Sequence, residues 1–531
     1  MSKIADYLRS HLRGEVVTSH DTREAYSRDG SVLKYSPLLV VHPFDINDIR
    51  KVVHFAWQLA QKKYTLPVTA RGGGSNTVGS AINNGVVIDC STHMNTILEL
   101  DTKQRLVRVQ PGLRIDTLQQ TLKTHGLEWP VTNIGSKDTV GGVIANDTVA
   151  KDNTSVADWI DQVEVVLANG DVLQAGNISK RELGKKKGLS SSEGDIYRRL
   201  DGLLHDLDET NKTNLLKNSI YGADRLRDGK QFSLLPIING SEGTLGIISE
   251  VILKLDTYTP EQEVLSVFVP SLDLFDKTLE SIQKLQPSNV EFIPKELVMY
   301  AKDHLGVSVS ELIDREDETN LEGALFIRFA GPKSRKTAKK VAKLCDKAGY
   351  LVVSSDQNYE AAREIWQIHD SLKQSLFLAE QDHKKPIPLL DDAMLEPSRI
   401  VDFGEKIAEL EKKHRVKIFW WGDLLSGTVR AYPLLNLHLL TDRQKVRKLM
   451  DDYYRIIVEN DGGVIGTWGV GRLRSHYVET ESADDIESID SQIKNIFDES
   501  NLLNPEVKLS TLSPKEFDKH LAETFNSSLY I

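Results

Sequence analysis

Hydrophobic and polar positions alternate in the first half of the chain in a way that predicts both helices and strands. Residues 46–63 carry apolar side chains every three or four positions, which is the spacing of one helix face. Residues 66–70 form a short apolar run that leads into three glycines, which is typical of a strand ending in a tight loop. Residues 163–174 alternate on both sides of Asn169-Gly170, a dipeptide that favours a hairpin turn.

A second series of strands and helices begins after residue 260. Strands are predicted at 263–269, 289–293 and 323–330, with amphipathic helices between them. A new series of alternating strands and helices indicates a second domain, of the α/β kind. Later in this series, residues 432–440 alternate leucines with polar residues and predict another strand.

The composition is that of an ordinary globular protein and excludes several classes. Asp plus Glu outnumber Lys plus Arg by 77 to 66, and the resulting net charge of −11 argues against a nucleic-acid partner. Cys90 and Cys345 are the only cysteines, which excludes a disulfide scaffold and indicates a reducing, cytoplasmic compartment. No stretch reaches the roughly 20 apolar residues of a transmembrane helix.

Three glycine-rich loops carry the first chemical signal. They read Arg71-Gly-Gly-Gly-Ser-Asn-Thr77, Gly135-Ser-Lys-Asp-Thr-Val-Gly-Gly-Val-Ile-Ala-Asn146 and Asn239-Gly-Ser-Glu-Gly-Thr-Leu-Gly-Ile-Ile248. Glycines let a backbone approach a ligand closely and turn its N–H groups toward an anion. The first loop matches neither a Walker nor a Rossmann loop, and alone it is equally consistent with a tight structural turn. Three such loops in order favour a ligand site.

The segments around these loops resemble a known flavoprotein family. The resembling segments are Ala70–Ser75, Val86–Asp89, Met94-Asn95, Arg105–Gly112, Thr139–Gly142, Gly240–Ile248 and Leu503–Pro505. They are similar to FAD-binding proteins with the vanillyl-alcohol-oxidase or p-cresol-methylhydroxylase (PCMH) type of fold, within the D-lactate dehydrogenase and glycolate oxidase branch. The resemblance implies an α+β fold of two domains. Residues 1–258, completed by 481–531, would bind FAD, and residues 259–480 would form an α/β cap domain for the substrate.

The resemblance also implies which residues bind FAD. The first loop would hold the pyrophosphate, the second would line the flavin, and the third would complete the cleft. The expected cofactor-binding residues are Arg71, Gly72, Gly73, Gly74, Ser75, Asn76, Thr77, Gly135, Ser136, Thr139, Gly141, Gly142, Ile144, Gly243, Gly246, Ile247, Ile248 and Asn504. The first loop lacks the histidine to which covalent members attach their flavin, so we expect FAD to bind non-covalently.

The substrate domain departs from the family pattern. Where relatives have two metal-binding histidines, this chain has Asp423 and Arg430, and arginine stays protonated and cannot bind a metal. Where relatives have a metal-binding glutamate and a catalytic histidine, it has Thr467 and Trp468. The motif residues on either side of these positions still match the family pattern, which indicates that the site residues changed together. We therefore expect no metal.

Other residues are candidates to replace the lost chemistry. Arg430 could anchor a carboxylate, with Arg472 and Arg474 as further candidates, although a surface or interdomain ion pair is an alternative for each arginine.

The base is harder to identify from the sequence. His438 shares the polar face of the predicted 432–440 strand with Asn436, and His369 stands where relatives often have arginine. Trp468 is expected to pack against the flavin or to fill the vacated metal space. The acidic pair Asp391-Asp392 is interpreted as structural.

These observations lead to two functional hypotheses. The first is an FAD-dependent oxidoreductase that oxidises a small, anionic, 2-hydroxy-acid-like substrate by hydride transfer to flavin N5 without a metal, and passes electrons to an unidentified acceptor. The second is a flavin-binding protein with little or no dehydrogenase activity, such as a subunit of a redox complex. A replacement base in the cleft favours the first, and a cleft filled by Trp468 favours the second.

Overall fold

The computed structural model resolves the chain into two compact units, which we describe separately. The first comprises residues 1–257 and 467–522, and the second comprises residues 258–466. The structure describes the chain except residues 1, 133–134, 136, 152–153, 230, 260–261, 305–320, 355–365, 367–368, 370–375, 377–379, 381, 482–483, 510–511 and 526–531.

The first unit contains a four-stranded sheet that delivers the first glycine loop. Its order is β1 (Glu15–Val17), β2 (Leu39–His42), β4 (Val86–Asp89) and β3 (Val68–Arg71), and β2, β4 and β3 run parallel. The predicted helix at 46–63 forms as α3 (Ile46–Ala60), capped by Asp45, and buries Ile49, Val52 and Val53 in the same core. Arg71 is therefore the last residue of a buried parallel strand, and the loop begins at the carboxyl end of that strand.

A seven-stranded antiparallel sheet builds the rest of the first unit. Its strands, in spatial order, are β10 (Arg227–Asp228), β11 (Gln231–Ser233), β9 (Val172–Ser179), β8 (Ile160–Val166), β12 (Ile247–Lys254), β6 (Leu106–Val109) and β5 (Ile97–Asp101). The predicted hairpin is confirmed, because β8 pairs with β9 and Gly170 at its turn has φ +86°. A short pair, β7 (Leu127–Glu128) and β13 (Asp256–Thr257), lies apart from this sheet.

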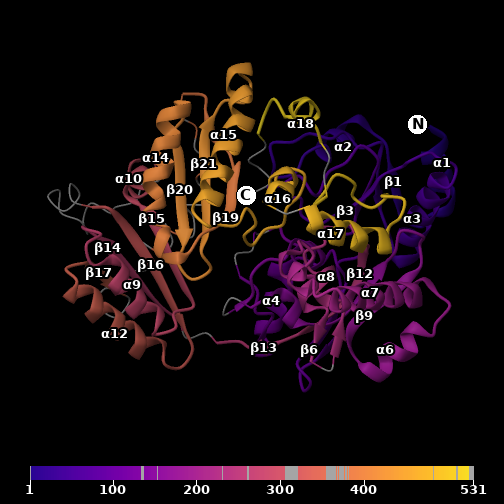
Figure 1. The fold of residues 1–531 in the computed structure, drawn as a ribbon, viewed down its shortest axis with the longest axis horizontal. Coiled ribbons are helices and arrows are strands. Elements are labelled where there is room, and N and C mark those ends of the chain that lie inside the picture. The colour runs from indigo at the N-terminus through magenta and orange to yellow at the C-terminus, as the bar shows by residue number, and fades with distance from the viewer. Residues whose placement is uncertain are drawn as a thin grey trace. The chain divides into compact units, whose positions relative to one another are not determined.

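Further helices of the first unit accompany these two sheets (Figure 1). They are α1 (Ser2–His11), α2 (His20–Ala25), α4 (Ile115–Lys123), α5 (Val140–Asn146), α6 (Lys180–Lys187), α7 (Ser192–Glu209), α8 (Leu235–Ile238), α16 (Ser475–Glu481), α17 (Asp484–Phe497) and α18 (Pro514–His520). Helices α4, α5 and α7 contribute Leu118, Ile144 and Leu200 to one hydrophobic core with strands β8 and β12.

The second unit has one antiparallel sheet. Its order is β17 (Leu351–Ser354), β14 (Gln262–Val269), β16 (Gly323–Ala330), β15 (Asn289–Pro294), β20 (Ile418–Asp423), β21 (Thr428–Leu435) and β18 (Lys385–Pro386), with β19 (Leu390–Met394) also pairing β21. Strand β16 separates β14 from β15, as in a split βαβ unit. The alternation of strands and helices therefore arises here without parallel neighbours.

Several helices accompany this sheet in the described part of the second unit. They are α9 (Phe275–Gln283), α10 (Lys295–His304), α12 (Ser334–Lys347), α14 (Phe403–His414) and α15 (Leu440–Glu459). Helix α12 packs on β14, β16 and β17 and contacts α9, and α14 contacts β20 and α15 (Figure 1).

Two boundaries differ from the sequence expectation. The predicted strand 432–440 is wrong at its second half, because β21 ends at Leu435 and His438 lies exposed in the following turn. The second unit ends at Gly466 rather than at residue 480. The reason is that the segment after it is bonded into the first unit, where the N–H groups of Arg472 and Leu473 donate to the carbonyl of Val78.

Candidate cofactor site

The first glycine loop leaves β3 with its backbone packed too closely for side chains. A Cβ on Gly72 would lie 2.2 Å from Thr139 Oγ1, and one on Gly73 would lie 2.1 Å from the carbonyl oxygen of Lys137. Gly74 has φ +72°, which is strained for residues with a Cβ. Glycine is therefore required at each position, and the loop lies directly against the second one.

Arg71 at the start of this loop is buried and held on several sides. Its Nη1 donates to the carbonyl of Arg28 at 2.7 Å, and its guanidinium lies 5.1 Å from the ring centroid of Tyr26. Burial lowers the pKa of Arg71, and the Asp29 carboxylate opposes this effect. The group keeps its positive charge at the wall of the cavity.

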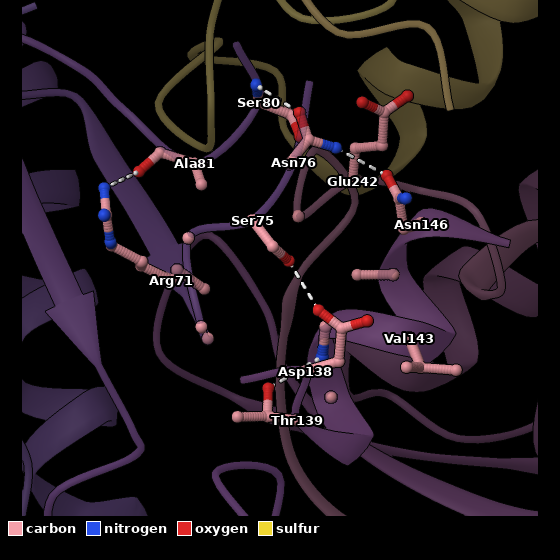
Figure 2. Close-up of a pocket in the computed structure, with 18 of the residues that line it drawn as sticks. Arg71, Ser75, Asn76, Ser80, Ala81, Asp138, Thr139, Val143, Asn146 and Glu242 are labelled. Atoms are coloured by element: carbon pink, nitrogen blue, oxygen red, sulfur yellow. Dashed lines mark hydrogen bonds between the residues drawn. The ribbon is translucent and has the colours of Figure 1, made fainter. Parts of the chain in front are cut away.

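The second loop is tied to the first by a buried carboxylate. Ser75 Oγ donates to Asp138 at 2.5 Å, and the Gly135 N–H donates to the same carboxylate at 2.7 Å. Burial raises the pKa of Asp138, and these hydrogen bonds oppose the rise. One residue later, Thr139 caps α5 by accepting the N–H of Gly142. Figure 2 shows Ser75 directed at Asp138 and Asn76 directed at Asn146, a bond of 2.7 Å.

The third loop is organised by Glu242. This residue has φ +53° and a buried side chain that accepts the N–H groups of Val470 at 2.6 Å and Gly471 at 2.8 Å. Lys508 lies 3.6 Å from the same carboxylate and donates to the carbonyl of Gly240 at 2.8 Å. Glu242 thereby fixes the segment that begins with Trp468.

These loops enclose a cavity of about 1320 Å³, part of it open to solvent. The lining residues are Ala70–Asn76, Ser80, Ala81, Cys90, Pro111, Gly135, Lys137–Thr139, Gly141–Val143, Ala145, Asn146, Thr148, Ser241–Gly243, Gly246, Ile248 and Trp468. The wall is made largely of glycine and small side chains, with Arg71 and Lys137 as cations and Asp138 and Glu242 as acidic residues. A large, flat, anionic group such as FAD fits this donor set, because glycine backbone can approach both a ring and a phosphate closely.

Most of the predicted cofactor residues line this cavity. The lining set includes Arg71, Gly72, Gly73, Gly74, Ser75, Asn76, Gly135, Thr139, Gly141, Gly142, Gly243, Gly246 and Ile248. Ile144, Ile247 and Thr77 are buried elsewhere, the two isoleucines in hydrophobic cores, and Ser136 lies outside the described residues. Asn504 lies behind the wall, where its amide donates to the carbonyls of Ser80 at 2.8 Å and Glu242 at 2.7 Å.

Sequence reasoning missed several lining residues that stand inside the quoted motifs. Lys137, Asp138 and Asn146 belong to the second loop, and Glu242 belongs to the third. Their polarity within glycine-rich segments was the available signal. Their roles depend on partners far along the chain, which the sequence does not reveal.

The arginines proposed as alternative anchors in the first unit have structural bonds. Arg472 donates to the carbonyls of Gly79 at 2.6 Å and Pro505 at 2.8 Å and lies 4.9 Å from the ring centroid of Tyr35. Arg474 is fully buried and is absent from the cavity wall. Trp468 lines the cavity.

The second unit places Arg430 beside acidic residues. Arg430 lies on β21 and is buried, with its Nε 3.9 Å from Asp391 Oδ1. Burial opposes its charge, but the Asp391 and Asp392 carboxylates outweigh burial and raise the pKa of Arg430. The two aspartates thus act as counter-ions.

A second buried pair shares this sheet face. His369 Nε2 contacts the carboxylate of Glu291 on β15, and the His369 ring stacks on Phe326 with centroids 4.6 Å apart. On the intervening strand β20, Trp421 pairs with Arg430 and Asp423 pairs with Glu291. Alternate residues of a strand share one face, so Glu291, Trp421 and Arg430 lie on the same side.

Two kinds of feature are absent from the part of the chain that the structure describes. It contains no cluster of three or more histidine, cysteine, aspartate or glutamate side chains able to hold a metal ion. It also contains no helix with the length and hydrophobicity needed to cross a membrane.

Comparison with known proteins agrees with this architecture. Residues 37–176 match the FAD binding domain family, and residues 259–507 match the C-terminal domain of FAD linked oxidases. D-2-hydroxyglutarate dehydrogenase of Haemophilus influenzae is 27% identical over 97% of this chain and 52% of its own length. Glycolate oxidase subunit GlcD of Bacillus subtilis is 23% identical over 93% of this chain and 92% of its own length.

The chain spans about half the length of the D-2-hydroxyglutarate dehydrogenases that it matches first. Among solved structures, p-cresol methylhydroxylase shares the fold, with a TM-score of 0.69, 13% identity and 96% of each chain covered. The two domain families occur in order and together span most of the sequence. The chain therefore belongs to the FAD-linked oxidase family of flavoproteins, with a two-domain α+β fold and an FAD-binding domain.

Proposed function

We propose that this protein is an FAD-dependent oxidoreductase that oxidises a small 2-hydroxy carboxylate without a metal ion. The cavity formed by the three glycine loops is the observation that carries the proposal, because its backbone wall and two cations suit FAD. The names of the relatives, a D-2-hydroxyglutarate dehydrogenase and a glycolate oxidase subunit, supply the substrate class. FAD, when bound, supplies the two-electron acceptor.

The polar sheet face of the second unit supports an anionic substrate. Trp421 Nε1 is a buried N–H group with no acceptor in the described part of the chain, and Trp421 is the cross-strand partner of Arg430. A carboxylate would give this N–H group an acceptor beside the positive charge of Arg430. His369, which contacts Glu291, is the residue of this face that we propose as the acceptor of the hydroxyl proton.

The proposal also covers the metal, the way FAD binds and the location of the protein. Asp423, Arg430 and Thr467 replace family metal ligands, so we propose that catalysis is metal-free. FAD is proposed to bind non-covalently, and the location to be cytoplasmic.

A second candidate function rests on Trp468. Its indole lines the cofactor cavity where relatives carry the catalytic histidine. A ring in that place could exclude substrate and leave a flavin-binding protein with little dehydrogenase activity.

One experiment separates the two candidates. The purified protein is loaded with FAD, and its flavin absorbance is followed anaerobically with D-2-hydroxyglutarate, D-lactate and glycolate, with and without chelator. Bleaching by one acid that survives chelator supports the metal-free oxidoreductase. Flavin that stays oxidised in the wild type but bleaches in Trp468→His supports the second candidate. A chain that binds no FAD contradicts both.

A further inference from the structure

The second unit carries an exposed row of lysines on α12. This helix buries Ala338, Val341 and Cys345 against the sheet. One flank of the helix presents five exposed lysines at steps of three, four, three and four residues, which places them on one face. They are Lys333, Lys336, Lys340, Lys343 and Lys347, which we call the lysine ridge. At 1.5 Å per residue, the ridge runs for about 21 Å.

The part of the chain that the structure describes supplies no partner for the ridge. None of its five ammonium groups has a hydrogen bond or ion pair among the described residues. The lysines of α6 behave differently, because Lys186 pairs with Glu193 and Lys187 lies 2.5 Å from Asp201. A run of lysines is usually only a solvated face, but here the positive charge is concentrated on one helix of a chain with a net charge of −11.

Exposed leucines stand on the two elements that α12 contacts. Leu274 precedes α9 and is 48% exposed, and Leu351 begins β17 and is 41% exposed. Helix α12 packs against both α9 and β17 (Figure 1). Among the strands that the structure describes, β17 is the last at its side of the sheet and pairs with β14 alone. Both elements in contact with α12 therefore carry an exposed leucine.

We propose that the lysine ridge docks this protein on the surface of an anionic phospholipid bilayer. Lysine is depleted and arginine enriched in protein–protein interfaces, where the rigid guanidinium suits fixed partners. A row made only of flexible lysines suits mobile lipid phosphates better. The flanking leucines suit the border between headgroups and acyl chains. Docking of this kind is peripheral and does not depend on the proposed oxidoreductase activity.

Vesicle co-sedimentation of the full, FAD-loaded chain tests the proposal. Binding is compared on phosphatidylcholine vesicles with and without about 30% phosphatidylglycerol, at low and high salt. We expect binding only to the anionic vesicles at low salt. Each lysine contributes about fivefold to partitioning, so Lys336→Gln/Lys340→Gln/Lys343→Gln should lower it about 100-fold. The corresponding triple arginine variant should keep it.

A matched control removes the same charge elsewhere. Lys62→Gln/Lys180→Gln/Lys185→Gln alters three exposed lysines of the first unit and should bind vesicles nearly as the wild type does. Melting temperatures of both triple variants check that they fold. Equal loss in both variants would show a net-charge effect and overturn the proposal. Absence of wild-type binding to anionic vesicles, or tighter binding to duplex DNA at the same salt, would overturn it too.

Discussion

At the residue scale, Arg430 illustrates how burial changes the expected effect of a substitution. Arg430→Gln leaves Asp391, which is 2% exposed, without the cation 3.9 Å away. Breaking a buried pair typically costs about 3–5 kcal/mol. The free energy of unfolding, measured with urea, should therefore fall by a similar amount in Arg430→Gln. Arg430→Gln/Asp391→Asn should recover much of the loss. Arg399→Gln, which breaks an exposed pair with Asp461, is the control and should change little.

This expectation revises a purely catalytic view of Arg430. If the arginine only anchored substrate, Arg430→Gln would unfold like the wild type while losing turnover of an acidic substrate. Unfolding and turnover measured on one preparation therefore separate the two roles. A stable but inactive variant would contradict the ion-pair argument.

Asp138 gives a pH-dependent prediction at the same scale. Burial raises the pKa of Asp138 above its ordinary 3.8, so the folded chain keeps a proton that the unfolded chain releases. Its contribution to stability is full below pH 3.8 and is lost as the pH rises through the folded-state pKa. Asp138→Asn has no such proton, so the free energy of unfolding should depend less on pH in this window.

Urea unfolding from about pH 4 to 8 measures this effect. Asp161→Asn, at an exposed position, is the matched control and should keep the wild-type pH dependence. If the free energy of unfolding depends on pH in Asp138→Asn as it does in the wild type, the Asp138 carboxyl is not the titrating group.

At the element scale, the first glycine loop can be tested by adding one methyl group. A Cβ at position 73 would meet a backbone carbonyl oxygen at 2.1 Å, which cannot move aside without shifting the second loop. Gly73→Ala should therefore weaken FAD binding at least tenfold, measured by flavin fluorescence titration. Gly184→Ala, in α6 where no atom lies within 4 Å, should leave FAD affinity unchanged. Equal FAD affinity in both variants would contradict the packing argument.

The same scale shows what the sequence could predict. The hairpin β8–β9 and helix α3 form as expected because their signals are local: a turn dipeptide and a repeat of apolar positions. The 432–440 strand fails because Asn436 Oδ1 accepts the His438 N–H at 3.0 Å, a turn that ends the strand and leads into α15. The alternation of apolar and polar residues looks the same in the β8–β9 hairpin and in residues 432–440. Local hydrogen bonding decides between them.

In the candidate site too, residues with a local signal could be predicted and residues with distant partners could not. Glycines 72–74 were identifiable because a run of three glycines by itself indicates a backbone that packs too closely for side chains. Glu242 was not, because its carboxylate binds backbone N–H groups 228 and 229 residues away. Long-range partners of this kind follow from the fold, and the sequence alone does not supply them.

At the scale of the whole molecule, the cofactor cavity joins four distant parts of the chain. Its wall is built from residues 70–90, 111–148 and 241–248 together with Trp468, all within the first unit. A ligand that binds only the folded state stabilises it by mass action, by about 2.7 kcal/mol at one hundred times its Kd. Added FAD should therefore raise the melting temperature of the wild type more than that of Gly73→Ala at the same FAD concentration. Riboflavin, which lacks the phosphates expected to meet Arg71 and Lys137, should give a much smaller shift. Calorimetry of the apoprotein with each ligand measures this, and equal shifts would show that the cations do not contribute to binding.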